Sequence, residues 1–126
     1  MASGSIDEIR EATRFIMELP RVIAVLLFGS VARGEATSRS DIDICVVAPG
    51  TETAEERSEL LGMIWRQIDG EKYDVRLFEE LPLYMKMDVI TSHVILHCND
   101  VPELFEYFYF YRKIWADEAH RQSVSY

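Results

Sequence analysis

The strongest constraint on the fold is an unbroken apolar run at residues 22–28, which reads VIAVLLF and stops at Gly29-Ser30. A short run that begins with β-branched residues predicts a strand, and the absence of polar alternation predicts that both of its faces are covered. Such a strand needs partner strands beside it and further elements packed over it. We therefore expect an α/β or α+β fold organised around this strand.

Capping signals and hydrophobic periodicity predict the remaining elements. Ser5 with Glu8, and Thr53 with Glu56, have the spacing of a capping box at the start of two amphipathic helices. Helices are expected over residues 5–19, from Thr53 to Gly70, over residues 81–90 and from Asp100 onward. Further strands are expected over residues 41–47, 73–78 and 94–96. The resulting order is helix, strand, strand, helix, strand, helix, strand, helix.

Size and composition limit the possible functions. The length of 126 residues suits one compact domain, so residues 1–126 are expected to form a single unit. No apolar run approaches the roughly 20 residues that cross a bilayer, and no signal peptide is recognisable, which predicts a cytoplasmic protein without a membrane partner. Cys45 and Cys98 lack metal-binding spacing and are expected to be reduced core thiols. The formal net charge of -9 disfavours nucleic acid as a direct substrate and suits a protein partner with a basic face.

The last predicted helix is aromatic nearly all round. One stripe of the kind that packs on a core contains Leu104, Tyr107, Phe108, Tyr111, Ile114 and Trp115. Phe105, Tyr109 and Phe110 lie off that stripe. Because so small a domain cannot bury every side of a helix, we expect another molecule to cover these three rings.

Two carboxylates are expected to stand together on the second strand. Side chains two apart on a strand point the same way, so Asp41 and Asp43 share one face while Ile42 and Ile44 pack into the other. Such a pair repels itself in the absence of a cation and matches the hard oxygen ligands that Mg²⁺ accepts together with substrate phosphate. The alternative is a turn at Asp41 followed by a surface Asp43, and the pair alone does not decide between them.

A phosphate-binding corner is expected at the end of the first strand. Gly29 permits close backbone approach, Ser30 offers a hydroxyl, and the helical turn that follows presents free backbone N–H groups. Arg33 and Arg39 flank the loop and could bind phosphate oxygens in pairs of hydrogen bonds. The alternative for this segment is a plain strand-to-helix turn with solvated arginines.

A third carboxylate, Asp74, opens the strand at residues 73–78 and shares its face with Arg76. If this strand lies beside the strand that carries Asp41 and Asp43, the three acids converge. A third acid could hold a second metal ion or take the proton of an attacking hydroxyl. The alternative is a solvated charge at the start of a strand.

These residues resemble a known signature. Gly29-Ser30, ten residues, then Asp41-Ile42-Asp43 is similar to the GS-x10-DxD motif of the minimal nucleotidyltransferases (MNT) in the polymerase β superfamily. The resemblance covers the whole chain and implies an α/β nucleotidyltransferase fold, with a mixed sheet of about four strands and helices packed mainly on one face. It also implies that Gly29 and Ser30 hold the triphosphate of ATP, that Asp41 and Asp43 bind Mg²⁺, and that Asp74 is the third catalytic carboxylate, with two ions in the complete site.

The resemblance further implies a partner. MNT proteins of this type act as antitoxins to HEPN ribonuclease toxins, and some transfer AMP from ATP to a tyrosine of the toxin. Two alternatives remain open from the sequence: a catalytically silent module that neutralises its partner by occlusion, and a nucleotidyltransferase for a small hydroxylated molecule. The acceptor, the preferred nucleotide and the oligomeric state, a homo-oligomer included, are left open.

Three further pairs of residues are interpreted as structural or solvated. They are His93 with His97, Lys72 with Arg76, and Trp65 with Trp115. The histidines bracket the short fourth strand without an acidic or cysteine ligand at matching spacing. The two cations flank a strand, and the tryptophans lie on helical stripes that are expected to face the core.

Overall fold

The apolar run forms the second strand from one edge of a four-stranded sheet. The structure is a computed structural model that describes residues 5–35 and 41–124. Strand β1 spans Ala24–Phe28, β2 spans Ile42–Val47, β3 spans Tyr73–Leu77 and β4 spans Val94–Cys98. Their order in the sheet is β3-β2-β1-β4, with β1 antiparallel to both of its neighbours and β2 parallel to β3. The predicted mixed sheet is confirmed.

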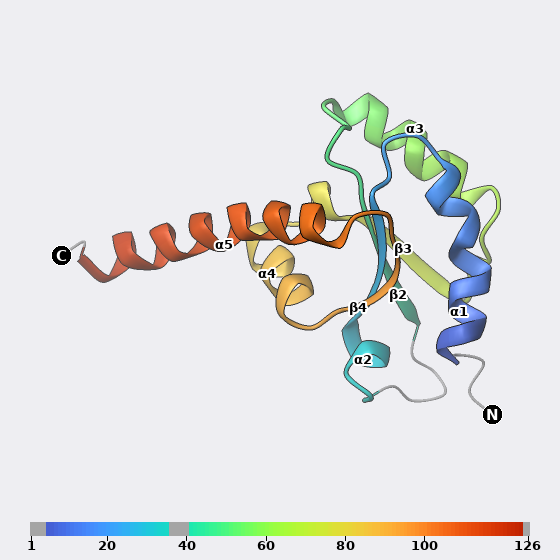
Figure 1. Cartoon of the computed structure of the whole chain (residues 1–126), viewed down its shortest axis with the longest axis horizontal. Coiled ribbons are helices and arrows are strands. Elements are labelled where there is room, and N and C mark those ends of the chain that lie inside the picture. Colours follow the sequence, from blue (N-terminus) through green and yellow to red (C-terminus); the bar gives the residue numbers. More distant parts are fainter. Residues whose placement is uncertain (1–4, 36–40, 125–126) are drawn as a thin grey trace.

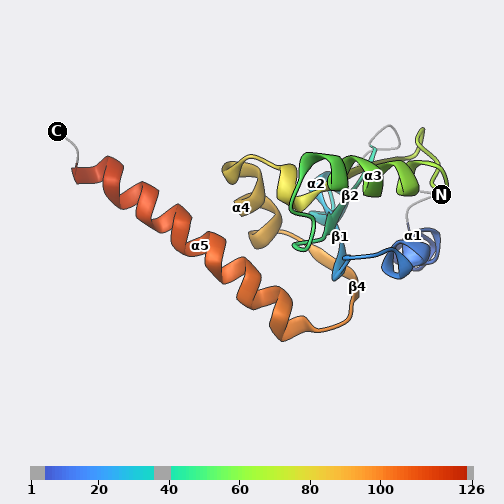
Figure 2. The ribbon, with the colours of Figure 1, turned by 90° about the horizontal axis from the view of Figure 1, so that it is seen from above.

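Helices lie on both faces of this sheet, as the two orthogonal views show (Figures 1 and 2). The α-helices are α1 (Ile6–Thr13), α2 (Gly29–Ala32), α3 (Ala54–Trp65), α4 (Leu83–Thr91) and α5 (Val101–Val124), and the short 3-10 helices are η1 (Arg14–Glu18) and η2 (Phe78–Glu80). Helices α1 and α3 cover one face, and α4 with the first part of α5 covers the other. The nucleotidyltransferase α/β fold is thus as predicted, but the helices are shared between the two faces instead of lying mainly on one.

Alternate residues of β1 and β2 pack into two separate hydrophobic cores, one on each face of the sheet. Val25, Leu27 and Ile44 pack beneath α1 and α3, whereas Leu26 and Cys45 pack beneath α4 and α5. All five residues of β1 are buried, as its unbroken apolar sequence predicted. The two faces therefore have nothing in common except the strands themselves.

The predicted helix over residues 5–19 is divided. It remains α-helical to Thr13 and then tightens into η1, which ends before Pro20. The Thr13 hydroxyl donates to the Ile9 carbonyl at 2.8 Å, and the residue itself leaves helical geometry at φ -105 and ψ 0. A 3-10 segment at the end of a helix is common, and hydrophobic periodicity alone does not distinguish it from a continued α-helix.

Helix α5 begins on the body of the molecule and then leaves it (Figure 1). Its first turns dock around Phe78, whose ring centroid lies 5.4 Å from Phe108 and 5.6 Å from Tyr107. Phe105, Tyr109 and Phe110 remain 45%, 61% and 57% exposed, as their position off the core stripe predicted. None of the described helices is long and apolar enough to span a membrane.

The interpretation of the tryptophans as core residues is wrong. Trp65 is 39% exposed and Trp115 is 43% exposed. Trp65 ends α3 and lies against Gly70, where a Cβ would meet its ring carbon at 3.3 Å. Trp115 belongs to the second half of α5 (Val101–Val124), and the end of this helix projects beyond the sheet (Figures 1 and 2).

Candidate functional site

The end of β1 forms a tight corner over the neighbouring strand. Gly29 adopts φ +77 and opens the single helical turn α2, so the chain reverses immediately after Phe28. A Cβ on Gly29 would lie 3.1 Å from Cγ of Asp43 and closer still to its Oδ2. A side chain is excluded here both by the left-handed backbone and by this contact. Glycine is therefore required for the corner to sit directly against the Asp43 carboxylate.

Asp43 lies at the centre of the site. It pairs with Phe28 of β1 on one side and with Asp74 of β3 on the other. Neighbouring strands are about 4.8 Å apart and residues in register share a face, so Asp43 and Asp74 project side by side toward the face that carries α4. The sequence predicted that Asp43 and Asp74 would converge if their strands were neighbours, and the pairing of β2 with β3 is confirmed. Asp41 lies just before β2 and is exposed.

The electrostatics of the two acids favour a cation. Burial raises the pKa of Asp43, and the nearby carboxylates of Asp74 and Asp41 raise it further, while Arg76 and Arg33 oppose this. Arg76 lies 3.5 Å from Asp74, in a half-exposed ion pair. Lys72 instead lies 5.7 Å from the centroid of the Tyr73 ring. Asp43 is thus a partly buried carboxylate that its surroundings do not favour in the ionised form.

The predicted phosphate ligands lie at the same end of the sheet. Ser30 is half-buried in the first turn of α2, where backbone N–H groups have no partner within the helix. Arg33 ends this turn and contacts Glu35 at 3.1 Å and Asp88 of α4 at 3.8 Å. Arg39 lies outside the described residues, so its predicted role stays a prediction.

The donor set of the site fits Mg²⁺. Two oxygen ligands stand together at Asp43 and Asp74, and their mutual repulsion is unfavourable without a cation. Among residues 5–35 and 41–124, no three acidic, histidine or cysteine side chains form a ready-made metal site. The pair therefore needs further ligands, from substrate phosphate and from Asp41, and the participation of Asp41 stays a prediction.

A second polar cluster, which the sequence did not indicate, lies between the end of β2, α4 and α5. Both carboxylate oxygens of Glu79 accept the backbone N–H of Ala48 at 3.1 Å, and one also accepts the hydroxyl of Tyr107 at 2.9 Å. The Lys86 ammonium is buried, donates to the Leu81 carbonyl and lies over the Phe78 ring at 5.6 Å. No periodicity or spacing links these residues, because three different elements bring them together.

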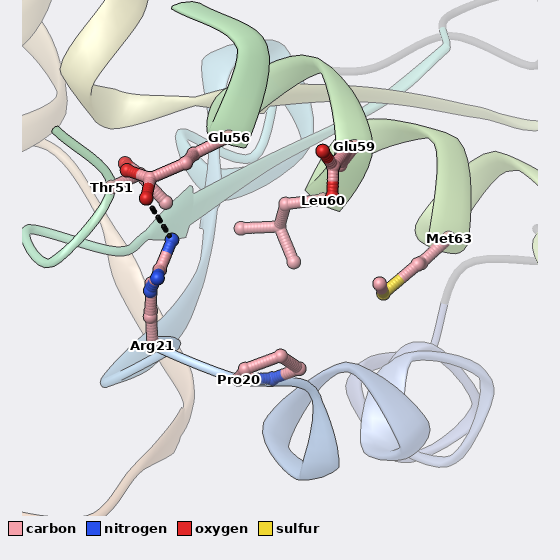
Figure 3. Close-up of a pocket in the computed structure, with 7 residues that line it drawn as sticks. All are labelled: Pro20, Arg21, Thr51, Glu56, Glu59, Leu60 and Met63. Carbon is pink, nitrogen blue, oxygen red and sulfur yellow. Dashed lines mark ion pairs between the residues drawn. The ribbon is translucent and has the colours of Figure 1, made fainter. Parts of the chain in front are cut away.

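Among the described residues, one hollow lies beside α3 and another includes Asp74 in its lining. The hollow of about 60 Å³ beside α3 contains the ion pair of Arg21 with Glu56 at 2.9 Å (Figure 3), and its lining does not include Asp43 or Asp74. The hollow of about 320 Å³ runs along β3. Its lining consists of Leu61, Asp74, Val75, Arg76, Leu77, Glu80, Leu81 and Pro82. Asp74 is thus common to the acid pair and to this groove.

The structural interpretation of the cysteines and histidines is confirmed. Cys45 and Cys98 are both free thiols, and burial raises the pKa of Cys45. His93 contacts the Val89 carbonyl at 2.8 Å, and His97 contacts the Arg10 carbonyl at 2.9 Å. These contacts connect the ends of secondary-structure elements and lie apart from the acids.

Comparison with known proteins agrees with this geometry. A family model described as a nucleotidyltransferase domain matches residues 6–97, which include both the corner and the acids. A Methanocaldococcus jannaschii protein whose provisional name is protein adenylyltransferase is 45% identical over 103 residues, covering 82% of this chain and 77% of that protein.

Solved structures share the same fold. A chain from a toxin–antitoxin complex with AMP-PNP superposes with a TM-score of 0.68 at 23% identity, covering 96% of this chain and 95% of that one. A chain from the complex of a tri-AMPylated Shewanella oneidensis HEPN toxin with its MNT antitoxin gives a TM-score of 0.60 at 21% identity, covering 94% and 91%. At these identities the likeness concerns the fold.

Proposed function

The chain belongs to the nucleotidyltransferase domain family, and from this premise we propose that it transfers AMP from Mg²⁺-bound ATP to a tyrosine of a HEPN-type partner protein. The observation that carries the proposal is the register of Asp43 with Asp74, next to the corner that Gly29 makes. The relative from M. jannaschii supports a protein acceptor. The enzyme would act in the cytoplasm as a single minimal domain.

The residues have distinct roles in this proposal. Gly29 and Ser30 bind the β and γ phosphates through backbone N–H groups and the serine hydroxyl, with Arg33 and Arg39 as further phosphate ligands. Asp41, Asp43 and Asp74 would hold two Mg²⁺ ions. When bound, these ions would neutralise negative charge on the α-phosphate and on the leaving group.

The transfer is an in-line displacement. The acceptor hydroxyl oxygen forms a bond to the α-phosphorus, and the bond from that phosphorus to the oxygen bridging toward the β-phosphate breaks. Pyrophosphate leaves toward the Gly29 corner. Asp74 accepts the proton of the hydroxyl, since it is the acid farthest from the corner in the order of the strands. Catalysis would rest on positioning and on charge, without a covalent enzyme intermediate.

The partner follows from two observations. A solved structure with this fold comes from a complex of a HEPN toxin with an MNT antitoxin, and another comes from a toxin–antitoxin complex. The present chain leaves Phe105, Tyr109 and Phe110 exposed on a helix that projects from the body. Three large rings on one exposed helix are typical of a protein contact surface. By labelling its partner, the chain would act as the antitoxin of the pair.

The test uses radiolabelled ATP, Mg²⁺ and a HEPN-type protein, which should first be sought in the neighbouring reading frame. We expect wild type to label the partner on tyrosine and the double variant Asp41→Ala with Asp43→Ala to lose at least about 100-fold in rate. Asp7→Asn is the matched control, because this aspartate is 99% exposed on α1. The proposal fails if wild type transfers no label, or if the double variant labels as fast as the control.

One alternative has a specific observation in its favour. The exposed rings of α5 could neutralise a partner by occlusion alone. In that case the double variant of Asp41 and Asp43 would still neutralise the toxin, while polar substitutions at Phe105, Tyr109 and Phe110 would abolish neutralisation. Label found on a small hydroxylated acceptor in the absence of any protein partner would instead favour a small-molecule enzyme.

A further inference from the structure

The sheet has a free edge beside the acids. Strand β3 is terminal in the order β3-β2-β1-β4. The Lys72 carbonyl accepts the Ile42 N–H at 3.1 Å, so the backbone groups of Lys72, Asp74 and Arg76 face β2. Because these groups alternate along a strand, the N–H and C=O of Val75 face away from the sheet. Within the described part of the chain, no backbone group pairs with them.

A groove follows this free edge and is lined from both faces of the sheet. Leu61 of α3 lines it from one face of the sheet, and Leu81 and Pro82 line it from the other. Its volume of about 320 Å³ suits a short stretch of peptide. Arg76 and Glu80 are 50% and 41% exposed along it and supply charge of both signs. At its start lies Asp74, one of the two paired acids.

The order of the strands decides from which side an acceptor arrives. The Gly29 corner belongs to β1, Asp43 to β2 and Asp74 to β3. Nucleotidyl transfer places the attacking and leaving oxygens in line on opposite sides of the phosphorus. If pyrophosphate leaves on the β1 side, the hydroxyl must approach from the β3 side. Among residues 5–35 and 41–124, the groove along β3 is a hollow on that side that includes Asp74 in its lining.

We propose that the acceptor is an extended segment of the partner protein, which adds to β3 as a further strand and presents its tyrosine hydroxyl to Asp74; this rests on the proposed function. Backbone pairing with Val75 holds the segment, and its alternate side chains contact Leu61 on one face and Pro82 on the other. The tyrosine shares the face of Asp74. The substrate class is therefore a tyrosine within an unfolded or strand-forming segment.

The first test removes the outward N–H of Val75. Val75→Pro deletes that donor without touching the bonds to β2, and proline is tolerated at such a position of an edge strand. Val75→Ala is the matched control, since it keeps the N–H and loses more side-chain volume. We expect Val75→Pro to lower kcat/KM for the partner protein at least about 10-fold and Val75→Ala to lower it less than about 3-fold. Affinity for AMP-PNP should be unchanged in both.

The second test leaves the enzyme intact. A synthetic peptide of about seven residues around the labelled tyrosine serves as acceptor, with backbone N-methyl groups on one or the other alternate set of residues. We expect one set to abolish labelling and the other to preserve it, because only one set faces β3. Equal behaviour of the two sets, or labelling of the folded partner but never of the peptide, would overturn the inference.

The outcomes separate this inference from the function on which it rests. If wild type labels the partner and Val75→Pro does so as well as Val75→Ala, the edge is not the acceptor site, although the transferase function stands. If wild type labels nothing, both fail. A dimer of the free chain in sedimentation, lost in Val75→Pro, would show that a second copy occupies the edge and would also overturn the inference.

Discussion

Two partly buried carboxylates of this chain have opposite surroundings. Burial raises the pKa of both Asp43 and Glu79. Glu79 accepts hydrogen bonds from Ala48 and Tyr107, which lower its pKa in part. Asp43 instead faces Asp74, and no described residue donates a hydrogen bond to it.

The hydrogen bonds to Glu79 indicate a structural role, whereas the acid beside Asp43 indicates a role in the candidate site. Glu79 accepts hydrogen bonds from Ala48 and Tyr107 and so joins the end of β2 to α5. Asp43 is held by the strand register against a second acid, which adds to the effect of burial and raises its pKa, while Arg76 and Arg33 oppose this rise without cancelling it. A carboxylate that the fold leaves uncompensated is a better indicator of chemistry than one that is merely buried.

The largest effect is expected from exchanging the two carboxylates for amides. Asp43→Asn should lower the rate of AMP transfer at least about 100-fold, because a ligand charge is lost where charge develops. Glu79→Gln should keep the rate within about 3-fold and lower the free energy of unfolding by about 1–3 kcal/mol, because buried donors lose a charged acceptor. Label transfer and urea unfolding measure the two effects. Equal loss of activity in both variants would show that Asp43 and Glu79 do not differ in their importance for transfer.

The contact between Gly29 and Asp43 offers the next test. Gly29→Ala adds a Cβ that collides with the carboxylate in a left-handed backbone, so we expect a large loss of transfer rate and about 2–3 kcal/mol of stability. Gly34→Ala is the control, because Gly34 also has positive φ, at +73, but nothing lies within 4 Å of a Cβ there. It should cost about 1 kcal/mol. Equal losses of stability in the two variants would mean that backbone strain, and not the collision with the Asp43 carboxylate, causes the loss.

A smaller effect is expected at the hydroxyl that Glu79 accepts. Tyr107→Phe removes the 2.9 Å bond and should lower the free energy of unfolding by about 1 kcal/mol. Tyr109→Phe, on the exposed side of the same helix, should change it by less than about 0.5 kcal/mol. Chemical denaturation followed by circular dichroism measures both. If the two variants had the same free energy of unfolding, the hydrogen bond from Tyr107 to Glu79 would not contribute to stability.

The smallest effect concerns pH. Because the pKa of Asp43 is raised in the folded state, the stability contributed by its protonated form is present below the ordinary aspartate pKa and lost as pH rises through the raised pKa. Asp43→Asn should therefore stabilise the magnesium-free protein at neutral pH, by less than about 1 kcal/mol given its partial exposure and solvent screening.

The gain should disappear as pH falls below the ordinary aspartate pKa, where the wild-type carboxyl is protonated in both the folded and the unfolded state. Thermal unfolding at several pH values measures it. Added Mg²⁺ should stabilise wild type and leave Asp43→Asn unchanged, since only the former keeps the carboxylate pair. A destabilised Asp43→Asn protein at neutral pH would contradict the unfavourable surroundings proposed for Asp43.

Much of the fold was predictable because its signals are local. The apolar run of β1, the capping box at Thr53 and the alternation in β3 each depend on neighbouring residues only, and all three elements were found. The tightening at Thr13 and the exposure of Trp115 were not predictable from periodicity. The tightening occurs where the Thr13 hydroxyl donates to the Ile9 carbonyl. The exposure of Trp115 depends on how much of α5 packs against the sheet.

The sequence by itself indicated the local features of the site: a glycine at the end of a buried strand, and an aspartate, Asp43, on the next strand. Tertiary structure decided that Asp74 lies beside Asp43, that Glu79 accepts hydrogen bonds from Ala48 and Tyr107, and that β3 is left as a free edge. The reason is physical. Strand order and long-range packing join residues whose separation along the chain carries no periodic signal, so only the folded molecule brings them together.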